Sequence, residues 1–179
     1  VQGDLRCERM SCSGASHIDG SVECSGKVSV SGATKILGSL TCGEALHCSG
    51  ALRCSVDVDT PELRCSGAMN VSGGVEAEAV RISGMAGIPG LLNAETVEIA
   101  ADRGIRIGSI GGGSIRIYQP QQKSLLGLFR SSCSCAQAGD IEGDDVDLEY
   151  TQADVVRGRR VRIGEGCSIG RVEYSESLD

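Results

Sequence analysis

The feature that most constrains this chain is a recurring Ser-Gly dipeptide behind a short apolar triplet. Ser-Gly occurs seven times between residues 13 and 84, and an apolar-x-apolar triplet such as Val28-Ser29-Val30 stands ahead of most of them. Alternation with period two sends both apolar side chains to one face of a short strand. We expect each glycine to supply the positive φ of a sharp corner. The repeat therefore predicts short strands joined by tight corners.

Longer spacings give the length of one coil. Two apolar series recur at steps of 17 or 18 residues: Met10, Val28, Leu46, Leu63, Val80, Val97 and Ile115, and Leu5, Val22, Leu40, Val58, Val75 and Leu92. Like residues would then stack on like in successive coils. We predict an all-β fold, a single-stranded right-handed β-helix with three short strands per coil of 17–18 residues. About nine coils, at ~4.8 Å per layer, would make a rod ~40–45 Å long.

A left-handed hexapeptide helix is the structural alternative. That fold usually places about one bulky aliphatic residue in every six and keeps its coil length nearly constant. Here two residues per strand face inward, and the coil slips between 18 and 17 residues, which favours the right-handed form.

The spacing of the apolar residues divides the chain into four parts. Coils are predicted over residues 3–118, an insertion loop over 119–131, a continuation of the β-helix over 132–174, and a tail over 175–179. The insertion contains the sequence QPQQKSLLGLFR, where the spacing is lost.

Charge and composition exclude several classes of protein. The net charge is −7, and residues 131–179 carry 5 basic and 11 acidic residues, a net of −6. Phosphate binding needs clustered positive charge, so we expect no nucleic-acid partner. The cluster of arginines in this part is a candidate electrostatic patch and consists of Arg157, Arg159, Arg160 and Arg162. No apolar run reaches the ~20 residues of a transmembrane helix.

The second half of the chain resembles a known family. The segments GLLNAETVEI (90–99), IGSIGGGSIRI (107–117), IEGDDVDLEY (141–150) and ADVVRGRRVRIGEGCSIGRVEY (153–174) resemble the bactofilins of Firmicutes, which are polymer-forming bacterial cytoskeletal proteins. The resemblance implies a right-handed β-helix that forms end-to-end filaments without nucleotide. It also implies a cytoplasmic protein, often at the inner face of the membrane, with itself as partner and the membrane surface or cell-envelope proteins as further partners.

The predicted ends suggest how such filaments would form. The apolar pattern begins at Leu5 and Cys7 and persists to Val172 and Tyr174, so these four residues are candidate end-to-end assembly surfaces. A solenoid exposes unpaired strand edges at both ends, and uncapped edges favour pairing with another copy. Capping tails outside this sequence are the alternative.

Ten cysteines raise the question of metal or disulfide chemistry. Cys12, Cys48 and Cys65 fall in one inward column, and Cys7, Cys24 and Cys42 fall in another. Their spacings are not those of zinc sites, and free cysteine packs as a small hydrophobe. We therefore expect core packing with no metal, and so many free thiols are typical of a reducing cytoplasm.

Enzymatic alternatives rest on few residues. His17 or His47 would be the catalytic histidine of a hexapeptide-type acyltransferase, and Asp144, Asp145 and Asp147 would serve a carbohydrate-active enzyme. Sugar clefts usually present aromatic platforms, and this chain has no Trp, one Phe and three Tyr. Gly111-Gly112-Gly113 lacks the Lys-Ser/Thr of a phosphate-binding loop. We expect no enzyme, no cofactor and no small-molecule substrate, with a monomeric interaction module as a further alternative.

The insertion carries a short apolar sequence between basic residues. Leu125, Leu126, Leu128 and Phe129 lie between Lys123 and Arg130 and are the candidate contact with a membrane or partner. The alternative is that they fold back and cover the rod.

Overall fold

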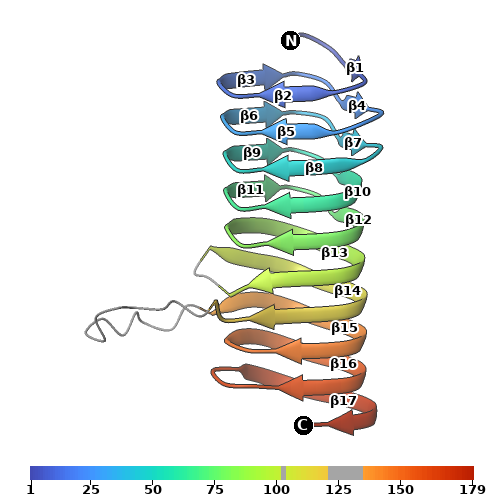
Figure 1. Cartoon of the computed structure of the whole chain (residues 1–179). Coiled ribbons are helices and arrows are strands. Elements are labelled where there is room, and N and C mark those ends of the chain that lie inside the picture. The colour runs from blue at the N-terminus through green and yellow to red at the C-terminus, as the bar shows by residue number, and fades with distance from the viewer. Residues whose placement is uncertain (102–103, 121–134) are drawn as a thin grey trace, which may run out of the picture.

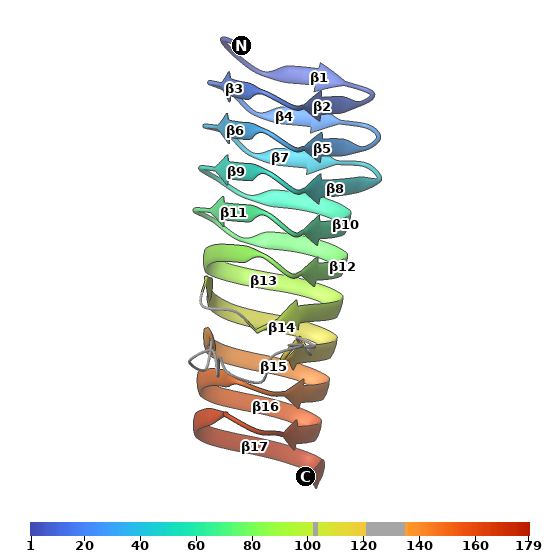
Figure 2. The same ribbon diagram turned by 60° about the vertical axis from the view of Figure 1, so that its left-hand side comes forward.

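The chain winds into one right-handed coil of parallel strands (Figures 1 and 2). The computed structural model describes residues 1–101, 104–120 and 135–179. Successive strands pair with the strands one coil away, and every pairing is parallel, as in Leu5 with Val22 and Val22 with Leu40. The predicted right-handed β-helix, a β-solenoid, is therefore confirmed.

Seventeen strands make up the described coils, and they lengthen toward the C-terminus. Their bounds are β1 (Leu5–Cys7), β2 (Met10–Cys12), β3 (Ala15–Ile18), β4 (Val22–Cys24), β5 (Val28–Val30), β6 (Ala33–Ile36), β7 (Leu40–Cys42), β8 (Ala45–Cys48), β9 (Ala51–Cys54), β10 (Val58–Cys65), β11 (Ala68–Val71), β12 (Val75–Ile82), β13 (Met85–Ala100), β14 (Ile105–Tyr118), β15 (Ala136–Leu148), β16 (Thr151–Ile163) and β17 (Ser168–Leu178).

Each coil has three faces, which we number in chain order. Face 1 contains β1, β4 and β7, face 2 contains β2, β5 and β8, and face 3 contains β3, β6, β9 and β11. The longer strands from β13 onward cross all three faces. Inward side chains stack like on like, as in Val28, Leu46 and Leu63 on face 2. These columns form one continuous apolar core.

The corner glycines act through close approach of the backbone. A Cβ on Gly50 or Gly67 would overlap the carbonyl oxygen of the corner glycine one coil earlier, Gly32 or Gly50. Among the described residues, positive φ occurs at Gly3, Gly166 and Tyr150. The prediction that the Ser-Gly corners need positive φ is therefore wrong. Glycine is required there because stacked corners leave no room for a side chain.

The coil changes along the axis. Partners lie 17 or 18 residues apart from Leu5 with Val22 to Val80 with Val97, but 15 apart at Ile141 with Val156. The prediction of 17–18 residues per coil therefore fails for the last coils.

A column at the corner between faces 1 and 2 accompanies this shortening. It contains Cys7, Cys24 and Cys42 near the N-terminus, Thr60, Ala77 and Ala94 in the middle, and Gly112, Gly143 and Gly158 near the C-terminus. A smaller inward residue lets the strand bend sharply without an interruption of the ladder. From β10 onward, longer strands that run through this corner follow from it.

The last strand extends into the segment predicted as a tail. Ser177 pairs with Arg160 and Leu178 with Val161, so β17 continues through residues 175–178. The apolar spacing to Val172 and Tyr174 did not reveal this, because the register shifts between Gly158 and Arg160. Residues 121–134, which include most of the predicted insertion, lie outside the described residues.

The corner argument yields a stability prediction. We expect Gly67→Ala to lower the free energy of unfolding by about 1–3 kcal/mol, because its Cβ must displace the backbone of the preceding corner. Gly14 occupies an equivalent corner with no atom within 4 Å of a Cβ, so Gly14→Ala is the matched control and should change little. Urea unfolding followed by circular dichroism measures both. Equal effects of the two substitutions would contradict the close-approach argument.

Candidate assembly surfaces

The N-terminal surface is formed by strands that pair on one side. In the described chain β1 pairs only with β4, and β2 pairs only with β5. The predicted assembly residues Leu5 and Cys7 both lie in β1 and are half-buried against the core. Part of face 3 is covered, because the amide of Asp19 donates to the carbonyl of Val1 at 3.0 Å.

The C-terminal surface is formed by β17, which pairs with β16 and with no other described strand. Val172 is half-buried and Tyr174 is 55% exposed, and both extend inward columns of the core region. Leu178, which the sequence did not single out, is 43% exposed and continues the column of Val161. Both ends of the described chain therefore present apolar side chains beside a strand edge.

The predicted arginine cluster is an ion-paired strand. Its four arginines lie on β16, between acidic residues of β15 and β17. The pairs are Arg157 with Asp140 at 3.5 Å and Glu173 at 3.0 Å, Arg159 with Asp144 at 3.9 Å and Glu176 at 2.5 Å, Arg160 with Asp145 and with Glu176 at 3.3 Å, and Arg162 with Asp147 at 3.5 Å. The cluster is therefore neutralised by both neighbours and is not a free basic patch.

This arrangement shifts the titration of exposed carboxylates. A hydrogen bond from Arg160 lowers the pKa of Asp145 below its usual value, and one from Arg159 does the same for Glu176. A carboxylate whose pKa is lowered on folding stabilises the fold above its unfolded pKa. That contribution is lost as the pH falls through the folded pKa.

The lowered pKa values of these carboxylates give a prediction for the pH dependence of stability. Arg160→Gln should lower the thermal midpoint at pH 7, and the difference from wild type should shrink as the pH falls from about 5 to about 2, where the carboxylates become protonated. Thermal unfolding across this range measures the effect. Lys27 has no ion pair among the described residues, so Lys27→Gln is the control for loss of one positive charge. A constant difference from wild type at every pH would contradict the role assigned to Asp145.

The cysteines lie mostly in the core. Cys24, Cys42, Cys48, Cys54 and Cys65 are buried, which confirms core packing for them, and Cys7, Cys12, Cys135 and Cys167 are half-buried. All nine are free thiols. Burial raises the pKa of Cys42 to about 12, and a hydrogen bond with Cys48 raises the pKa of Cys65. Within the described ranges, no three His, Cys, Asp or Glu side chains are grouped to hold a metal ion.

Burial predicts uneven thiol reactivity. At pH 8 iodoacetamide should alkylate Cys12 much faster than Cys42, because only the thiolate reacts and a pKa raised from 9.0 to about 12 leaves roughly a thousandfold less of it. Mass spectrometry of peptides after timed labelling measures the two rates. The control is the protein in guanidinium chloride, where the rates should become equal. Equal labelling of the folded protein would contradict the buried position of Cys42.

The two histidines lie on different faces. The His17 Nε2 atom on face 3 is 2.8 Å from the Asp19 carboxylate. His47 on face 2 stacks between Ser29 and Arg64, and burial lowers its pKa. The structure therefore does not bring them together, and it places Asp144, Asp145 and Asp147 beside arginines of β16.

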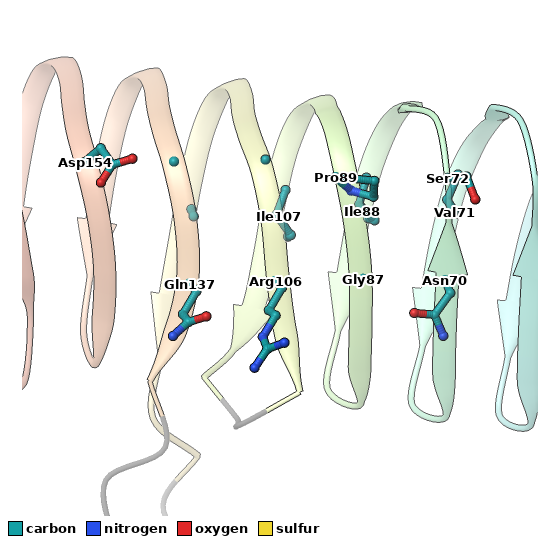
Figure 3. A pocket seen from close by; sticks show the side chains of 13 residues that line it. Asn70, Val71, Ser72, Gly87, Ile88, Pro89, Arg106, Ile107, Gln137 and Asp154 are labelled. Carbon is teal, nitrogen blue, oxygen red and sulfur yellow. The ribbon is translucent and has the colours of Figure 1, made fainter.

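Several shallow hollows lie on the sides of the described rod, and two of them collect polar side chains from successive coils. One of 490 Å³ on face 3 is lined by Asn70, Gly87, Arg106 and Gln137, which stand on successive coils (Figure 3). Gly87 leaves a gap in this row of polar side chains (Figure 3). The other, of 1030 Å³, lies along the glycine corner and is lined by Glu76, Glu95, Glu142 and Arg157 among others. Sequence reasoning missed both, because they depend on which residues stack across coils.

The predicted membrane contact cannot be placed. Leu125, Leu126, Leu128 and Phe129 lie outside the described residues. Within the described parts of the chain, no helix is long and apolar enough to span a bilayer.

The fold defines the class of this protein as a β-solenoid, and comparisons with known proteins add one short match. No family model matches the chain, and no solved structure does. A stretch of 34 residues is 68% identical to the uncharacterized protein YhbF of Bacillus subtilis (strain 168). The match covers 19% of this chain and 14% of that protein.

Proposed function

We propose that this protein is a structural scaffold of the bactofilin type, which assembles end to end into filaments without nucleotide. The observation that carries the proposal is the pair of strand surfaces at the two ends of the described solenoid. At each, backbone donors and acceptors lie beside inward columns that another coil would continue.

Main-chain pairing would supply the geometry of the contact. Parallel strands in register already hold every coil to the next, and a second copy can repeat that pattern at an open edge. Since Leu5, Val172 and Leu178 belong to inward columns, stacking another copy on them would bury apolar area. The same forces that build one rod would extend it.

The free thiols support a cytoplasmic site of assembly. Nine described cysteines are unpaired, and reducing compartments keep thiols in that form. The proposed partner is another copy of the chain, with the membrane surface or cell-envelope proteins as further partners through the 119–131 segment.

Negative-stain electron microscopy of the purified chain, with no nucleotide added, tests the proposal. We expect filaments one β-helix wide. The variants Leu5→Arg and Leu178→Asp should shorten or abolish them, because each places a charge in one end surface. Met85→Arg is the matched control, since Met85 is 54% exposed on a side of the rod.

Circular dichroism must show that every variant keeps its fold. Filaments lost in the end variants and kept in Met85→Arg would support assembly through the ends. Monomeric wild-type particles at all protein concentrations would overturn the proposal for this chain.

A further inference from the structure

A ladder of basic side chains runs along face 3. Five outward residues on successive coils are Lys35, Arg53, Asn70, Gly87 and Arg106, each paired in register with the next. The three cations are exposed, and none forms an ion pair with a described residue. We call these five residues the basic ladder.

A ladder of acidic side chains on face 1 has the same spacing. Its five outward residues on successive coils are Asp59, Glu76, Asn93, Gly111 and Glu142. The three carboxylates are exposed and without an ion pair in the described ranges, although Glu76 accepts a hydrogen bond from Asn93 at 2.7 Å. We call these residues the acidic ladder. In both ladders the first, second and fifth residues are charged, the third is Asn and the fourth is Gly.

Most other arginines of the described chain are already neutralised. Nine form ion pairs within the rod: Arg6, Arg64, Arg81, Arg116, Arg157, Arg159, Arg160, Arg162 and Arg171. The charges of the two ladders are left without such partners, and they lie on different faces of the rod. One molecule therefore cannot pair its own ladders.

We propose that the basic ladder of one copy docks on the acidic ladder of a second copy, so that rods associate side by side. With both chains running in the same direction, Lys35 meets Asp59, Arg53 meets Glu76, and Arg106 meets Glu142. Antiparallel rods would match two of these pairs and leave Arg53 opposite Gly111. Parallel alignment is therefore the arrangement that pairs all three cations.

The common layer spacing makes this match possible. Both ladders repeat at the same ~4.8 Å distance between strands, so their charges stay in step over about 19 Å. The contact joins two different faces, and a heterologous contact of this kind builds open arrays instead of closed dimers. Sheets of parallel rods follow. This contact does not depend on end-to-end assembly.

Charge reversal tests the proposal. The variants are Lys35→Glu/Arg53→Glu on the basic ladder and Asp59→Lys/Glu76→Lys on the acidic ladder. Sedimentation velocity and electron microscopy at low ionic strength should show lateral association of wild type weakened at least roughly tenfold in each variant. Mixing the two variants should restore it, since each supplies the ladder that the other lost. Arg9→Glu/Lys27→Glu is the control: it changes the net charge by the same amount as the first variant, at two residues that lie just ahead of β2 and β5 and form no ion pair with a described residue, and it should leave association intact.

The outcomes separate this contact from others. Loss in each variant with recovery in the mixture would establish the ladder contact, whether or not filaments elongate from their ends. Unchanged lateral association in the variants, or no recovery in the mixture, would overturn it. Vesicles of phosphatidylserine and phosphatidylcholine complete the test. If they bind wild type but not Lys35→Glu/Arg53→Glu while the rods never associate, the partner is a lipid surface and the proposal is wrong.

Discussion

Parallel pairing in register is the constraint on which the rest of this structure depends. Each residue lies on its counterpart one coil away, so every inward position becomes a column and every outward position becomes a ladder. An inward column must hold residues of compatible size, as Val28, Leu46 and Leu63 do. An outward ladder must hold neighbours that tolerate about 4.8 Å separation. The arginines of β16 satisfy this rule because carboxylates lie on the strands to both sides.

The same constraint separates charges that hold the rod together from charges that face outward without partners. The ion pairs of β15, β16 and β17 join adjacent coils within one molecule and form its charge network near the C-terminus. The unpaired side chains on faces 1 and 3 are available to another molecule. A scaffold needs both kinds, since one maintains the shape of the subunit and the other decides how subunits meet. The proposed function and the lateral contact thus draw on different residues.

Much of the fold could be predicted from the sequence, because one residue type repeating at a fixed step already implies a stacked column. The two apolar series and the inward cysteines were of this kind. The features that could not be predicted from the sequence depend on the register of strand pairing between coils. The continuous long strands follow from small residues that stack at one corner, such as Gly112 and Gly143. The pairing of Leu178 with Val161 lies beyond a register shift, and the two ladders combine residues whose spacing varies from 17 to 31.

The gradual lengthening of the strands makes the rod mechanically uneven. Near the N-terminus each coil is held by strands of three or four residues, whereas β13 to β16 contain 13 to 16 residues each. The stability of a solenoid is approximately a sum of one contribution from each coil and one from its contact with each neighbouring coil. Under tension or thermal stress, the short coils would therefore fray first while the long ones remain wound. Such a rod would unwind in steps from its N-terminal end, and its C-terminal half would stay folded longest.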